Sequence, residues 1–77
     1  MNAQRRKEIA KAISLMEQVR EILDATAEEE RDAYDNLPEG IQYSERGDQM
    51  EEYADTLERV CAEISDYIDE LQEVIDN

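Results

Sequence analysis

Apolar residues recur at a fixed interval through the second half of the chain. Two columns repeat every seven residues and together form an alternating three-four seam, which is typical of helices that pack as a coiled coil. The first column is Met50, Leu57, Ile64 and Leu71, and the second is Ala54, Cys61, Ile68 and Ile75. A third column beside them comprises Tyr53, Val60, Tyr67 and Val74. The seam predicts a helix over residues 44–76 whose apolar face is wider than one partner helix can cover.

The first half repeats this pattern less regularly. One column consists of Ile9, Met16 and Leu23, and a second of Ala12, Val19 and Thr26. Beside the second column fall Ile13, Ala27 and Tyr34, and the opposite shoulder carries Leu15 and Ile22. The pattern then gives way to the charged run 28–32, which is either a solvated helix end, the interpretation we favour, or a contact surface. This half predicts a helix over residues 3–34.

The only proline and both glycines of the chain lie between the two patterns, at Pro38, Gly40 and Gly47. Proline removes a backbone donor and glycine frees the backbone, so we expect the chain to fold back here. Ser44 is the expected N-cap of the second helix. We expect the apolar residues of the turn to fold inward and close the end of the core, namely Leu37, Ile41 and Tyr43.

The two helices have matched lengths of about 45–50 Å, which favours an antiparallel hairpin whose ends finish together. Charge placement favours the same topology. A basic cluster of Arg5, Arg6 and Lys7 begins the first helix, and an acidic block ends the second at Asp66, Asp69, Glu70, Glu73 and Asp76. Each block opposes the dipole of its own helix, and the two compensate when they lie side by side. The sequence therefore predicts an all-α fold, an antiparallel helical hairpin forming a single domain over residues 1–77.

A hairpin of this kind leaves much of each wide apolar face uncovered. Exposed apolar surface of that extent usually marks a protein interface. The economical solution is a twofold dimer that forms a four-helix bundle, and larger assemblies are the alternative. The residues expected at this oligomer interface are Leu15, Ile22, Tyr53, Val60, Tyr67 and Val74.

The chain carries 22 acidic and eight basic residues, which gives a net charge of −14. One interpretation is a solvated surface that maintains solubility, and the other is a surface that competes for a basic, nucleic-acid-binding partner. The expected acidic partner face includes Asp66, Asp69 and Glu73. Direct binding to nucleic acid is not expected, because the phosphates would be repelled over most of the surface.

The sequence lacks the residues that several kinds of catalytic and metal site require. Without histidine there is no Ser-His-Asp arrangement, no imidazole zinc site and no Glu-x-x-His di-iron motif. A calcium loop over residues 35–46 fails, because Leu37 and Arg46 stand where oxygen ligands are required. Acidic pairs three residues apart could hold Mg²⁺, but they lie on one helix and mostly outside the apolar columns. Cys61 sits in an apolar column, where a buried thiol is expected. We therefore predict no enzymatic activity, no metal site and no cofactor.

No stretch reaches the roughly twenty apolar residues needed to span a bilayer, so a cytoplasmic location without a membrane anchor is expected. The start of the second helix is the one place that suggests a ligand. Tyr43, Ser44, Arg46 and Gly47 place a ring, a hydroxyl, a guanidinium and backbone donors at a helix N-terminus, which favours an anion. Capping by Ser44 and pairing of Arg46 with a carboxylate would explain the same residues structurally. Glycine is unfavourable in an exposed helix, so Gly47 indicates close approach of another backbone or of a ligand.

The run from Tyr34 to Gly47 contains the stretches Asp-Asn-Leu-Pro-Glu and Ser-Glu-Arg-Gly and continues to Met50-Glu51-Glu52. It resembles a box in short acidic proteins of phages, prophages and Gram-positive bacteria, in which these stretches precede a final amphipathic helix. The resemblance implies a phage origin and no particular site residues. Small phage proteins without enzymatic motifs often inhibit host machinery or defence.

The leading hypothesis is a phage-type accessory protein that acts in the host cytoplasm by binding a host macromolecule, with its acidic face imitating nucleic acid. A second hypothesis is an oligomeric sponge that sequesters a small signalling nucleotide through the turn over residues 37–48. A third is a structural subunit of a helical bundle. The expected partners are further copies of the chain and a host protein, with a small nucleotide as the ligand in the second case.

Overall fold

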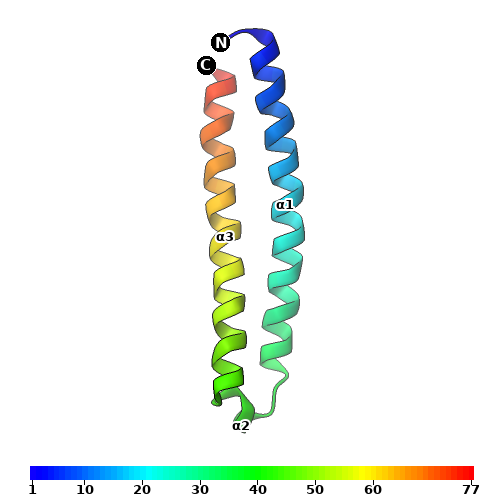
Figure 1. Cartoon of the computed structure of the whole chain (residues 1–77), viewed down its shortest axis with the longest axis vertical. Coiled ribbons are helices and arrows are strands. Elements are labelled where there is room, and N and C mark those ends of the chain that lie inside the picture. Colours follow the sequence, from blue (N-terminus) through cyan, green and yellow to red (C-terminus); the bar gives the residue numbers. More distant parts are fainter.

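The computed structural model describes all 77 residues and confirms the all-α hairpin. Helix α1 (Ala3–Asp35) and helix α3 (Glu45–Asp76) run antiparallel, with both termini at one end, and the short helix α2 (Glu39–Gln42) closes the other end (Figure 1). The molecule is a rod of 58 × 15 × 13 Å. The two long helices lie within one residue of the predicted bounds. Helix α2 was not predicted, because four residues are too few to show an apolar period.

The helix ends are capped by side chains. Asn2 accepts a hydrogen bond from the Arg5 N–H at 2.8 Å and begins α1. Ser44 is the N-cap of α3, as predicted, and its hydroxyl accepts from the Gly47 N–H at 3.4 Å. At the end of α1, the side-chain amide of Gln42 donates to the last carbonyls, those of Tyr34 at 3.1 Å and Asp35 at 3.3 Å. These carbonyls have no partner within the helix, so Gln42 holds the turn against α1.

The seam of α3 is the predicted one. Ala54, Cys61 and Ile68 are buried, and the other column of α3 is half-buried along its length. Gly47 is also buried and stands seven residues before Ala54, so it is the first member of the same column. The seam therefore begins in the first turn of α3.

The seam of α1 corrects the prediction. The residues that face α3 include Ile13 and Ala27, which are buried, whereas the predicted column of Ala12, Val19 and Thr26 is exposed. The full contacting column recurs every seven residues as Arg6, Ile13, Arg20, Ala27 and Tyr34. Two of its five members are arginines. The apolar pattern of the sequence therefore indicated the neighbouring column. A long arginine stem can cover apolar surface while its head stays polar.

The turn and the charged run 28–32 also differ from the favoured expectations. Tyr43 does not plug the end of the core, since it is 77% exposed, and Ile41 is exposed as well; only Leu37 is half-buried. The charged run 28–32 is not simply a solvated end. Arg31 binds Asp55 at 2.6 Å and Glu58 at 3.2 Å, and so joins α1 to α3.

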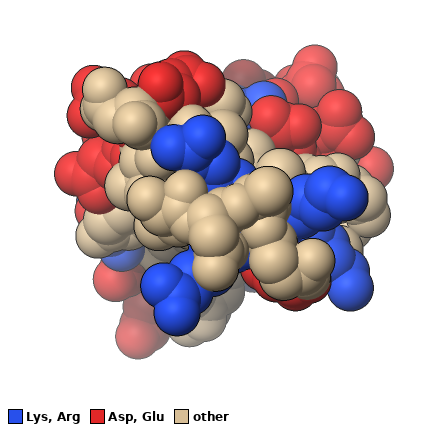
Figure 2. Space-filling view, turned by 90° about the horizontal axis from the view of Figure 1, so that it is seen from above, with Lys and Arg blue, Asp and Glu red and all other residues tan.

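The basic cluster at the start of α1 does lie at the same end as the acidic block of α3. In Figure 2, which views this end, Lys and Arg side chains are spread around the molecule, with Asp and Glu toward the rim. No ion pair joins the two blocks, and the only pair besides those of Arg31 is Arg59–Glu63, within α3. The structure therefore shows no contact that carries the expected compensation, which stays a prediction.

Candidate binding surfaces

The start of α3 is packed against the chain's own turn. A methyl group on Gly47 would lie 2.5 Å from the carbonyl oxygen of Ile41 and closer still to that of Gln42. Contacts this short do not occur, so only glycine fits here. The close approach that the sequence indicated at Gly47 is therefore that of the α2 backbone.

The other three residues expected to bind a ligand point in different directions. The Ser44 hydroxyl donates to the Ile41 carbonyl at 2.5 Å, while Tyr43 projects into solvent. Arg46 is exposed and lines a shallow depression together with Glu45, Asp48, Gln49 and Glu52. Three carboxylates around one guanidinium disfavour an anion. Ligand binding by this turn stays a prediction, and the residues that would support it are not gathered into one pocket.

One broad side of the hairpin is polar, and Arg31 is its main contact between helices. The guanidinium donates through Nε and one terminal nitrogen to the two oxygens of Glu58, at 3.2 Å each, and also to Asp55. These hydrogen bonds raise the pKa of Arg31 above its ordinary value. Further toward the turn, a hydrogen bond to Glu51 raises the pKa of Tyr34. We call this side, with Asp24, Arg31, Glu51, Glu58 and Ser65, the polar face.

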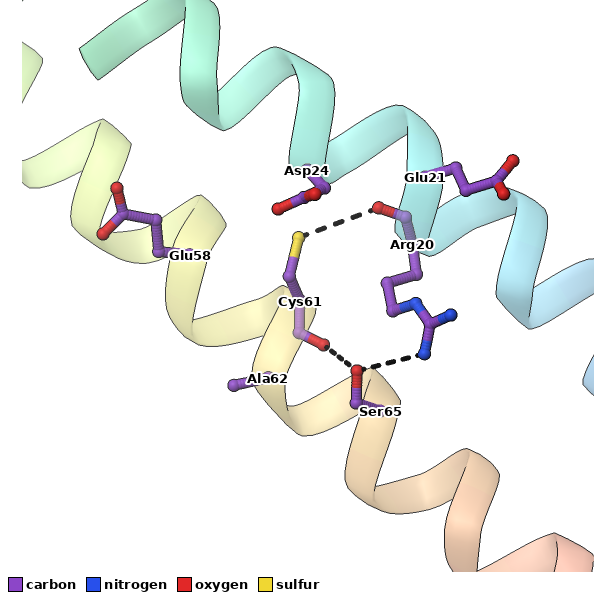
Figure 3. A pocket seen from close by; sticks show the side chains of 7 residues that line it. All are labelled: Arg20, Glu21, Asp24, Glu58, Cys61, Ala62 and Ser65. Carbon is purple, nitrogen blue, oxygen red and sulfur yellow. Dashed lines mark hydrogen bonds between the residues drawn. The ribbon is translucent and has the colours of Figure 1, made fainter.

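The polar face contains an open groove of about 480 Å³ at Cys61 (Figure 3). The Cys61 thiol points at the Arg20 carbonyl, 3.9 Å away, and burial raises its pKa. Arg20 donates to the Ser65 hydroxyl at 3.3 Å, which in turn donates to the Cys61 carbonyl at 3.1 Å. A buried thiol with a raised pKa is a weak nucleophile. These residues satisfy one another, and their arrangement is that of a structural contact.

The outward surface of α3 carries a regular row of acids. Ten positions follow one another at three-four spacing from Glu45 to Asp76, all are exposed, and eight of them are acidic. We call the eight the acidic stripe: Glu45, Asp48, Glu52, Asp55, Asp66, Asp69, Glu73 and Asp76. The predicted partner face of Asp66, Asp69 and Glu73 is its central and C-terminal part. The three-four spacing was present in the sequence and could have identified the whole stripe.

The side opposite the polar face is apolar. On α1 it presents Leu15, Val19 and Ile22, which are 54%, 46% and 65% exposed. On α3 it presents Tyr53, Tyr67 and Val74, which are 52%, 56% and 41% exposed, and the half-buried Val60. We call these seven residues the apolar face. It contains all six residues predicted for an oligomer interface, with Val19 in addition.

Comparison with known proteins adds no relative. No family model, curated protein or solved structure matches the chain. No group of three or more His, Cys, Asp or Glu side chains is placed to hold a metal ion. None of the helices has an apolar stretch of the length that a membrane span requires. The surfaces of the hairpin itself therefore carry the functional argument.

Proposed function

We propose that the chain is a non-enzymatic accessory protein of phage type that binds a basic, nucleic-acid-binding protein of the host through the acidic stripe. The observation that supports this is the regularity of the stripe: eight of the ten exposed positions at three-four spacing along α3 are acidic, and the other two are Arg59 and Ala62. The likeness of residues 34–47 to a box in phage proteins supports the origin and, with it, action in the host cytoplasm.

The charge density of the stripe is comparable with that of nucleic acid. Helix α3 has 32 residues and extends for about 47 Å, so the eight carboxylates of the stripe come to about one per 6 Å. One strand of B-DNA has one phosphate per 3.4 Å of axis. The stripe therefore has more than half the linear charge of a single strand, enough to attract a phosphate-binding groove at moderate salt.

We propose in addition that the chain acts as an oligomer, because the apolar face is too large to remain in water. The nucleotide sponge has less support, since the one arginine near the turn lies among carboxylates. Its test is thermal stabilisation of the protein by a panel of nucleotides, with the shift lost in Arg46→Ala. The bundle-subunit hypothesis predicts that charge changes on α3 leave every interaction intact.

The stripe is tested by neutralising three of its carboxylates, with Asp66→Asn, Asp69→Asn and Glu73→Gln in one variant. A matched control changes the same number of exposed acids on α1, with Glu17→Gln, Glu21→Gln and Glu28→Gln. Each variant has a net charge of −11 instead of −14. Proteins retained from a host lysate are identified, and their affinity is measured with purified components.

The expected result is that the α3 variant loses a nucleic-acid-binding partner that the α1 variant retains, while circular dichroism shows both helical. Duplex DNA should displace the partner from the unmodified protein. Equal losses in both variants would mean that net charge alone attracts the partner. Retention by both would show that the stripe is not the binding surface.

A further inference from the structure

The chain exposes more surface than a compact monomer of its mass, by about the area that a second copy of the chain would cover. The chain exposes 5735 Å², whereas a compact monomer of 9.0 kDa exposes about 4,850 Å². The excess of about 900 Å² is close to the roughly 800 Å² that each partner buries at a standard interface. One broad side of the rod, 58 by 15 Å, has about the same area. A partner of the same length and width therefore fits the face.

We propose that two copies pack through the apolar face about a twofold axis perpendicular to the rod, with α1 against the partner's α1 and α3 against the partner's α3. The two turns then lie at opposite ends of a four-helix bundle. The other twofold arrangement, with the axis along the rod, places α1 against the partner's α3 and both turns at one end. The residues at the edges of the apolar face distinguish the two.

The edge of α1 is apolar where the edge of α3 is acidic. Leu15 and Ile22 extend the apolar face outward on α1, and the equivalent positions of α3 are Thr56, Glu63 and Glu70. Arg20 donates to Ser65 through the tip of its side chain, and its backbone carbonyl contacts the Cys61 thiol. Leu15 therefore lies level with residues 66–70 of α3 and Ile22 with residues 59–63, segments that end at Glu70 and Glu63. Packing α1 on the partner's α3 would thus set both apolar side chains beside glutamates. Packing α1 on the partner's α1 sets Leu15 beside Ile22 of the second copy, with Val19 at the axis.

The charges of α1 favour the same arrangement. Its outward surface begins with Lys7 and Lys11 and ends with Glu28, Asp32 and Asp35. An antiparallel copy of α1 brings the basic start of each helix beside the acidic end of the other. Against α3, which is acidic throughout, only the start of α1 would be matched. The two α3 helices repel each other in the proposed dimer, and salt screens this repulsion because the carboxylates are exposed.

The dimer has a consequence that rests on the proposed function. It places two acidic stripes side by side and antiparallel, on one surface of the bundle. The two stripes together have 16 carboxylates along the roughly 47 Å of α3, which is about one charge per 3 Å, against one per 1.7 Å in duplex DNA. The alternative dimer would separate the stripes to opposite corners. Pairing of the α3 helices thus gives one surface with about the linear charge of a single DNA strand, twice that of one stripe.

The test uses a cysteine at the axis, in protein whose own Cys61 is changed to Ala. In the proposed dimer, Val19→Cys places two thiols next to each other across the twofold axis. We expect their Cα atoms to lie within the roughly 4.4–6.8 Å that a disulfide spans. Gln18→Cys is the matched control, one residue away on the outward surface of α1. Under mild oxidation, we expect Val19→Cys to form a covalent dimer at least tenfold faster than the control. Before oxidation, sedimentation should give twice 9.0 kDa, with the association strengthened by salt.

Three results would overturn the proposal. In sedimentation, these are a 9.0 kDa monomer at tens of micromolar and an assembly whose mass is not that of two copies. In crosslinking, it is a disulfide that forms only when Val19→Cys is mixed with Tyr67→Cys, which indicates the alternative dimer. Because these experiments use the purified chain alone, their failure leaves the acidic stripe untouched. Conversely, loss of the host partner in the α3 variant without loss of the dimer separates the two proposals.

Discussion

The two long helices have almost the same length and very different designs. Helix α3 has two unbroken columns toward its partner and a nearly uniform acidic stripe on its outer surface. In α1 one column is interrupted by Arg6 and Arg20, and the outer surface changes from basic to acidic along its length. The apolar period of α3 alone is enough to predict which face of that helix turns inward. For α1 the inward face depends on the contacts that its side chains make with α3.

The arginines of α1 show how those contacts act. Arg20 donates a hydrogen bond to the Ser65 hydroxyl and lies next to Cys61. The Nε of Arg6 is buried without a hydrogen-bond partner. A polar group within a seam costs stability and restricts which alignments of two helices are acceptable. The four predictions below test the contrast between the helices, and the largest expected effect comes first.

Truncating one buried isoleucine on each helix should have equal effects. Ile13 of α1 and Ile68 of α3 are 5% and 6% exposed, so each change to Ala should lower the free energy of unfolding by about 2–4 kcal/mol. Urea unfolding followed by circular dichroism measures it, with the exposed Gln18→Ala as the control. A cost below about 1 kcal/mol for Ile13→Ala would mean that the column of Ala12 and Val19 packs against α3 instead.

The two glycines should respond oppositely to alanine. Gly47→Ala inserts a methyl group into the carbonyls of α2, and we expect it to lower the free energy of unfolding by about 1–3 kcal/mol. Gly40 has open space around its Cβ position and lies in a helix, so Gly40→Ala should be neutral or stabilising by up to about 1 kcal/mol. Equal effects at the two positions would contradict the packing of α3 against the turn.

Making α1 resemble α3 should stabilise the hairpin. Arg20→Leu continues the apolar column of Ile13 and Ala27, and we expect the free energy of unfolding to rise by about 1 kcal/mol. The Ser65 hydroxyl keeps its bond to the Cys61 carbonyl. Arg59→Leu, on the exposed surface of α3, is the control and should not stabilise. A loss of stability in Arg20→Leu would show that the bond to Ser65 outweighs the apolar contact.

The smallest effect concerns alkaline pH. Burial raises the pKa of Cys61, so the folded chain retains its thiol proton where the unfolded chain has lost it. The contribution of this group is fully present below the unfolded pKa of about 8.5 and is lost as pH rises through the higher folded pKa. Stability measured from pH 8 to 10 should therefore fall less steeply in Cys61→Ala. Identical slopes would mean that the thiol is solvated in the folded state.

Much of the fold could be predicted from the residues. The columns of α3, the cap at Ser44 and the position of the turn follow from period, capping chemistry and the three helix-breaking residues. The acidic stripe could have been predicted completely, because its eight residues fall on ten positions that follow one spacing. The role of the turn residues was harder to predict. Gly47 did indicate a close approach, but the identity of the approaching group depends on where α2 lies.

By itself the sequence determined two amphipathic helices, their antiparallel order and the apolar surplus on one side, since these properties depend on spacing along a helix. Only the tertiary structure decided that Arg6 and Arg20 belong to the seam, that Arg31 joins the helices and that Gln42 caps α1. Each of these residues is polar, and a polar side chain does not reveal its partner through a period. Its place depends on distances between groups far apart in the chain, which exist only after the hairpin has closed.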